Sequence, residues 1–236
     1  MNITELIKRK RFAPGKGVYE LPPEKGIKRM GFVIITYFWE LVTLNLLFMI
    51  FCIPLVTIPA ALCGMNRVLI LLVRGGNCRL WNEFVKEFKA NFFKSLPFGL
   101  LFAVLLFMSY YALSISISLS NSSSLDVFSG AIGLFILGLV LLFSSYVFVL
   151  LPSLALKNRH IAKNAFILML SEWQTNLVII GSIAVMAFVI VALLPYTLIL
   201  LAFVGFSLSQ LIVCTAVNGP MQRRIIEPFE LKEKEG

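Results

Sequence analysis

Several uncharged apolar runs, each about twenty residues long, constrain this chain more than any other feature of its sequence. An α-helix rises about 1.5 Å per residue, so roughly 20 residues cross the hydrocarbon core of a bilayer. Charged residues make up only 14% of the 236 residues and hydrophobic residues 59%, whereas a soluble domain is about a quarter charged. The sequence therefore predicts an all-α, polytopic helical membrane protein. It excludes a soluble domain, a disordered tail and a disulfide scaffold.

The apolar runs place a helical bundle, 32–217, between a basic N-terminal segment, 1–31, and a charged tail, 218–236. A mixed segment, 80–94, is expected to form a cytosolic amphipathic helix before the third span. Pro54 and Pro59 lie around the turn between the first two spans. The six expected transmembrane helices occupy about 32–53, 55–73, 97–119, 127–151, 177–194 and 196–217.

Lysine and arginine are distributed unevenly among the connections, with eight in 1–31, six in 65–97 and none in 120–126. Connections rich in these residues stay in the cytosol. We therefore expect both termini and 75–94 to be cytosolic and 120–126 to be external. The same bias explains the net charge of +9 without a nucleic-acid partner.

Two features leave alternatives open. Asn66 and Arg67 interrupt the second run, so 55–73 could instead be re-entrant or interfacial, which would leave five spans. A short motif also recurs, because 87–92 and 172–177 both begin with glutamate and an aromatic residue and carry asparagine three residues further on. Duplicated half-bundles are common in transport-related membrane proteins, so the motif would fit a weak internal duplication.

Glu40 is the only acid well inside an expected span, and Arg67 is the only base there. Isolating a charge in the bilayer costs roughly 2.5–3.5 kcal/mol. Counted along straight helices, the two residues lie about 12 and 9 Å from the same cytosolic boundary. They are therefore candidates for a structural ion pair, or for two side chains that each reach the boundary alone. A proton- or ion-coupling role for Glu40 is the functional alternative.

Two sets of residues are candidates for packing or docking. Apolar side chains in 80–94 share one helical face, which could lie on the inner leaflet or bind a partner; they are Trp81, Phe84, Val85, Phe88 and Phe92. Small residues in the fourth span would let another helix approach closely; they are Gly130, Gly133 and Gly138.

Motifs for catalysis, nucleotide binding or metal binding are absent from the sequence. It contains no Walker A, H-E-x-x-H, G-x-S-x-G or G-x-G-x-x-G pattern. The four cysteines show no C-x-x-C spacing, and the single histidine lies in a basic loop. We therefore expect no enzymatic activity, no cofactor and no ATP binding by this chain.

The segment 45–61, NLLFMIFCIPLVTIPAA, resembles the opening of the YesL-like family of bacterial integral membrane proteins. Further pieces match in the same order: Leu72–Gly75, then Phe84, Phe88, Asn91 and Phe92, then Leu151–Leu156 and Lys163–Phe166. The polar pair Asn66 and Arg67 departs from the family pattern, which has apolar or aromatic residues there.

The resemblance implies a multi-pass protein of the bacterial cytoplasmic membrane that acts with carbohydrate ABC importers, particularly importers of oligosaccharides. The implied role is an accessory subunit, or an assembly or regulatory factor, that contacts the importer's transmembrane subunits. No site residues come with the resemblance. An independent small-solute transporter or channel, with Glu40 and Asn45 lining a path, is the alternative. Its weakness is that sugar hydroxyls need polar partners to replace water, and the expected spans contain few.

Overall fold

The structure is a computed structural model that describes residues 27–75, 79–118, 124–154, 156–192 and 201–228. These ranges contain helices and short connections, with no strand among them. Five helices are long and apolar enough to cross a membrane, and a bent pair of shorter helices makes a sixth candidate span. The all-α, polytopic membrane fold expected from the sequence is thus confirmed.

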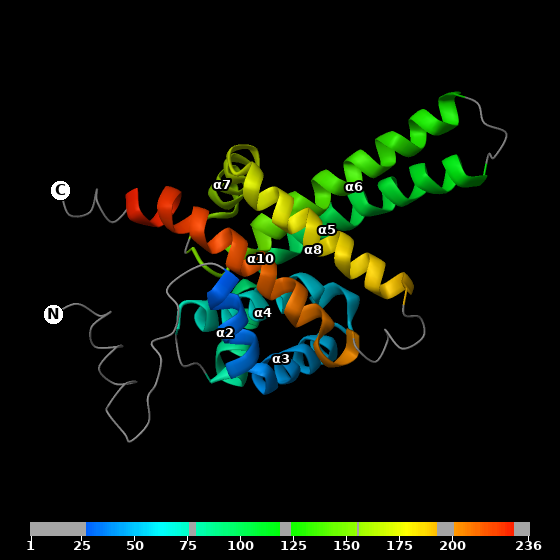
Figure 1. Cartoon of the computed structure of the whole chain (residues 1–236). Coiled ribbons are helices and arrows are strands. Elements are labelled where there is room, and N and C mark those ends of the chain that lie inside the picture. The colour runs from blue at the N-terminus through cyan, green and yellow to red at the C-terminus, as the bar shows by residue number, and fades with distance from the viewer. Residues whose placement is uncertain (1–26, 76–78, 119–123, 155, 193–200, 229–236) are drawn as a thin grey trace, which may run out of the picture.

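Figure 1 shows how the helices are arranged. In chain order they are α2 (Ile27–Thr36), α3 (Phe38–Phe51), a short 3-10 turn η1 (Leu55–Thr57), α4 (Ile58–Val73), α5 (Leu80–Ser118), α6 (Ser124–Leu150), α7 (Asn158–Ser171), α8 (Trp173–Ala192), a π-helical turn η2 (Leu201–Gly205), α10 (Phe206–Met221) and a second π-helical turn η3 (Gln222–Ile226).

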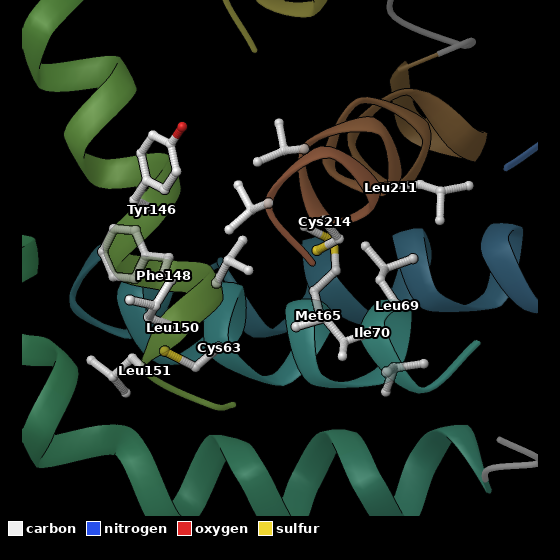
Figure 2. Close-up of a cluster of buried hydrophobic side chains, with 14 of the residues drawn as sticks. Cys63, Met65, Leu69, Ile70, Tyr146, Phe148, Leu150, Leu151, Leu211 and Cys214 are labelled. Carbon is white, nitrogen blue, oxygen red and sulfur yellow. The ribbon is translucent and has the colours of Figure 1, made fainter. Parts of the chain in front are cut away.

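The apolar core lies where α4, α6 and α10 meet (Figure 2). Met65 and Leu69 on α4, Leu150 on α6 and Leu211 on α10 are fully buried there. In contrast, α8 and the distal part of α5 expose most of their apolar side chains. A membrane protein can expose such side chains because lipid tails are as apolar as leucine.

The first expected span, 32–53, does not form one straight helix. Instead, α2 and α3 meet at Tyr37 with a bend of 81°. Four successive β-branched residues, 33–36, precede the bend, and such residues have a lower helix propensity. A run that is uniformly apolar in sequence is therefore divided into two helices of 10 and 14 residues, each too short to cross about 30 Å alone.

The bent pair nevertheless runs the full length of α4. At the start of α2, Arg29 donates hydrogen bonds from Nε to the carbonyl of Val73 (2.8 Å) and from Nη2 to that of Leu72 (3.0 Å). At the other end, Phe51 leads to the start of η1 and α4 through three residues. If the first run crossed the bilayer and 55–73 did not, Arg29 and Val73 would lie on opposite sides. Their contact therefore favours two crossings by 27–73 over the alternative in which the first run crosses and 55–73 is re-entrant or interfacial, while the described helices fit five spans, or six if the bent pair is one span.

The expected amphipathic helix 80–94 and the third span form one 39-residue helix, α5, with Pro97 inside it. Phe84 contacts Gly64 of α4, and Gly99 contacts Pro59. A straight helix would separate Phe84 and Gly99 by about 22 Å, whereas Pro59 and Gly64 are only about 8 Å apart. The helix therefore bends between these contacts, and Figure 2 shows its first part passing under the core before the ribbon turns upward.

The remainder of α5 pairs with α6 in an antiparallel hairpin that projects from the rest of the molecule (Figure 1). We call this projection, residues 100–118 and 124–139, the arm. At the other end of the chain, α10 and η3 continue to Ile226, past the expected boundary at 217. Pro220 lies inside this helix and is buried. Proline is tolerated within transmembrane helices because neighbouring helices can satisfy the backbone groups that it leaves without partners. The break expected between the spans 177–194 and 196–217 lies outside the described residues.

Candidate functional site

The structure does not pair the two intramembrane charges. Glu40 lies in the first turn of α3, and none of the described ion pairs joins it to Arg67. Arg67 Nη1 instead donates to the carbonyl of Pro152 at 3.5 Å, and its Nε is buried without a hydrogen-bond partner. The matched depth of the two residues was counted along a straight helix, and the bend at Tyr37 removes that match.

The aromatic face of 80–94 packs mainly inside the molecule. The ring of Phe51, at the end of α3, lies 5.2 Å from that of Phe84 and 4.9 Å from that of Phe88. Phe84 is completely buried, whereas Trp81 is 61% exposed. Val85 is partly buried, and Phe92 is partly buried beside Phe88. This face therefore joins α5 to α3 and α4, which leaves Trp81 as its exposed member.

Two of the three candidate glycines permit close approach between helices, and the approach is between α5 and α6 of the same chain. A β-carbon at Gly130 would lie 2.5 Å from Ser116 Oγ, and one at Gly133 would lie 3.2 Å from the carbonyl oxygen of Ser109. Ser109 Oγ also donates to the Gly133 carbonyl at 2.6 Å. In contrast, nothing lies within 4 Å of a β-carbon at Gly138. The first two glycines therefore hold the arm together.

Two buried asparagines join helices that are distant in sequence. Asn45 Oδ1 accepts a hydrogen bond from the backbone N–H of Ser207 (3.0 Å), in the first turn of α10. Asn66 Nδ2 donates to the carbonyl of Phe148 (2.8 Å), and its Oδ1 accepts from Cys214 Sγ (3.4 Å). Buried polar groups need such partners, and hydrogen bonds of this kind support helix association in lipid.

The sequence offered a signal for these contacts, because both asparagines interrupt apolar runs. It could not identify their partners. Asn45, which an independent transporter would place along its path, is completely buried and bonds across to α10. The structure therefore assigns Asn45 to contact between α3 and α10.

A second group of polar contacts lies at the break between α7 and α8. Glu172 accepts a hydrogen bond from Arg224 Nε (2.6 Å) and contacts Arg223 (3.8 Å). Asn176 donates to the carbonyl of Met169 (2.6 Å) and accepts from the hydroxyl of Tyr146 (2.7 Å). These contacts connect the α7–α8 break to α6 and to η3.

The repeated glutamate–asparagine motif does not have the same role at its two positions. Asn91 Nδ2 donates to Glu87 Oε1 (2.6 Å) within the continuous helix α5. Glu172 and Asn176 instead lie at a helix break and bond to residues of other segments. The local structures therefore add nothing to the case for an internal duplication.

Positive charge gathers at the C-terminal end of α4. Arg74 Nε donates to Asn218 Oδ1 on α10 (3.0 Å). Arg74 is exposed, but the surrounding protein removes part of the hydration of its guanidinium and so lowers its pKa, and the charge of Arg67 lowers this pKa further. Within the described ranges, no group of three or more His, Cys, Asp or Glu residues is placed to hold a metal ion. The chemistry that this end of the bundle offers is that of guanidinium groups.

Comparison with known proteins adds one finding. Residues 41–113 match the model of a family described as a protein of unknown function, DUF624. The match covers about a third of the chain and includes nearly all of α3, all of α4 and most of α5. No curated protein and no solved structure matches this chain. The matched segment contains the buried asparagines and the Phe84 contact described above.

Proposed function

We propose that this protein is a non-enzymatic accessory subunit, or an assembly or regulatory factor, of a bacterial carbohydrate ABC importer. It would act by lateral contact between its helices and the importer's transmembrane subunits. The observation that carries the proposal is the contrast between a closed apolar core (Figure 2) and a projecting arm with a large apolar surface. The resemblance of residues 45–61 to the YesL-like family suggests the importer as the partner.

The arm offers more apolar surface than the packing of this chain uses. Its exposed large apolar side chains are Leu100, Leu101, Val104, Leu106, Phe107, Met108, Tyr110, Tyr111, Phe128, Ile132, Leu134, Phe135 and Leu139. Lipid can cover such a surface, and so can the helices of another membrane protein, because van der Waals packing drives association in the bilayer. Aromatic side chains are enriched among the residues that dominate protein interfaces.

Affinity purification of the tagged full-length protein in mild detergent, followed by mass spectrometry, tests the proposal. We expect importer transmembrane subunits to co-elute. Phe107→Ala with Tyr111→Ala, one turn apart on the arm, should weaken the association roughly thirtyfold and reduce their recovery accordingly, because each aromatic anchor contributes about 1 kcal/mol.

The matched control is Phe166→Ala with Leu170→Ala, an exposed pair with the same spacing on α7. This control should leave recovery unchanged. If no importer subunit co-purifies with the unmutated protein, the accessory role fails and an independent transporter becomes the first hypothesis. Solute uptake by vesicles that contain only the purified protein would then test that transporter directly.

We further propose that the protein lies in the cytoplasmic membrane with both termini in the cytosol. The lysine and arginine bias supports this orientation, and the Arg29 contact with Val73 supports placing the start of α2 and the end of α4 on one side. The orientation can be tested with single cysteines in a variant whose own four cysteines are replaced. A cysteine at Ser123 should react with an impermeant reagent in intact cells, whereas one at Asn82 should react only after permeabilisation. The opposite labelling pattern would reject the orientation.

A further inference from the structure

Three arginines surround the C-terminal end of α4. Arg29 is buried and caps this end through the carbonyls of Leu72 and Val73. Arg74 lies at the surface, and Arg67 lies two turns earlier on the same face of α4. Seven residues of α-helix rise only about 10 Å, so two positive groups lie toward one end of the bundle. In keeping with this spacing, the charge of Arg67 contributes to lowering the pKa of Arg74.

Within the described ranges, no acidic side chain forms an ion pair with either of these two groups. Among the residues that the structure describes, the ion pairs are those of Glu172 with Arg223 and Arg224. Glu87, on the part of α5 that packs against α4, instead accepts a hydrogen bond from Asn91. The contacts of Arg67 and Arg74 are with neutral oxygens, the Pro152 carbonyl and Asn218 Oδ1.

The inner member of the pair is also incompletely hydrogen-bonded. Arg67 Nε is buried and has no acceptor, and the one contact of its Nη1 is long, at 3.5 Å. A buried donor without a partner is costly, and a bound anion would supply the acceptor that Nε lacks. Guanidinium groups match phosphate oxygens because their planar donors can form two parallel hydrogen bonds.

We propose that Arg67 and Arg74 form a binding site for a phosphate-bearing anion at the end of α4, with Asn218 orienting the Arg74 guanidinium. The phosphate belongs to the headgroup of an anionic phospholipid or to a soluble phosphate. Basic sites between transmembrane helices near the cytoplasmic face bind anionic headgroups in this way. The site is separate from the arm, so the test of anion binding does not depend on whether the arm contacts an importer.

Binding of short-chain lipids to the full-length protein in nonionic detergent, followed by native mass spectrometry, tests the site. Phosphatidylglycerol should bind in preference to phosphatidylcholine. Because each arginine near the membrane surface contributes about 1 kcal/mol, Arg74→Gln and Arg67→Gln should each weaken binding about fivefold. Arg159→Gln, which removes an exposed arginine from α7, is the matched control and should leave binding unchanged.

Inorganic phosphate, titrated in a parallel experiment, distinguishes the two sources. Binding of phosphatidylglycerol alone with this variant dependence supports a lipid headgroup, and the same dependence with inorganic phosphate supports a soluble anion. Arg67→Lys, which keeps the charge, should retain part of the binding. Arg74 is exposed, so Arg74→Gln carries the test if Arg67→Gln does not fold. Absence of binding by both probes, or equal weakening by Arg159→Gln, would overturn the proposal.

Discussion

Replacing Phe84 by alanine should lower the free energy of unfolding by about 3–5 kcal/mol, the usual cost of emptying a buried phenylalanine site. Phe84 is completely buried, and its ring lies between Phe51 of α3 and Gly64 of α4. Hydrogen bonds of Asn66 and Asn45 connect α4 to α6 and α3 to α10. These connections limit how far α3 and α4 can shift to fill the cavity that the substitution leaves. Thermal unfolding of the full-length protein in detergent, together with its size-exclusion profile, measures the loss.

Two controls on the same helix separate packing from hydrophobicity. Phe93→Ala removes the same side chain from a position that is 81% exposed. Trp81→Ala removes the exposed member of the aromatic face. Both should change stability by less than about 1 kcal/mol, as surface substitutions usually do. Equal destabilisation by Phe84→Ala and Phe93→Ala would contradict the packing of this face against α3 and α4.

For the aromatic face of 80–94, the sequence predicts which side chains share a side of the helix but not which residues they contact. Its spacing correctly places Phe84 and Phe88 together on one side of a helix. Spacing alone does not identify what that side contacts, because lipid, a partner and the chain's own helices are all apolar. The partner is Phe51, more than thirty residues earlier, and its position depends on the bend at Tyr37.

The same bend at Tyr37 bears on Glu40 and Arg67, which form no ion pair with each other among the described residues. The helical, multi-pass architecture with five or six apolar helices follows from composition, because a bilayer requires about 20 apolar residues in each helix. Depth within a span follows from residue number only where the helix is straight, and α2 and α3 meet at 81°. The site at the end of α4 has a similar origin: Arg67 and Arg74 are visible in the sequence, but the contacts with Pro152 and Asn218 come from segments about 80 and 140 residues away.

Replacing Gly99 by alanine should destabilise the protein, whereas the same replacement at a helical glycine with no neighbouring atoms should stabilise it or have no effect. In a helix interior, replacing glycine by alanine normally stabilises by about 0.5–1 kcal/mol, because alanine loses less backbone freedom on folding. A β-carbon at Gly99 would lie 2.1 Å from Cγ of Pro59, whereas nothing lies within 4 Å of one at Gly138. The proline ring is rigid, so α4 and α5 would have to separate, and overpacking of this kind costs about 1–3 kcal/mol.

We therefore expect Gly99→Ala to lower the melting temperature of the full-length protein in detergent and Gly138→Ala to raise it or leave it unchanged. Gly99→Leu should lower it further, since a larger side chain increases the conflict with Pro59. The Pro59 contact lies just beyond the bend of α5, where the arm leaves the core, so Gly99→Ala should also loosen the arm. Protease cleavage within 100–118 should then become faster than in Gly138→Ala. Stabilisation by both substitutions would show that α4 and α5 do not meet at Pro59.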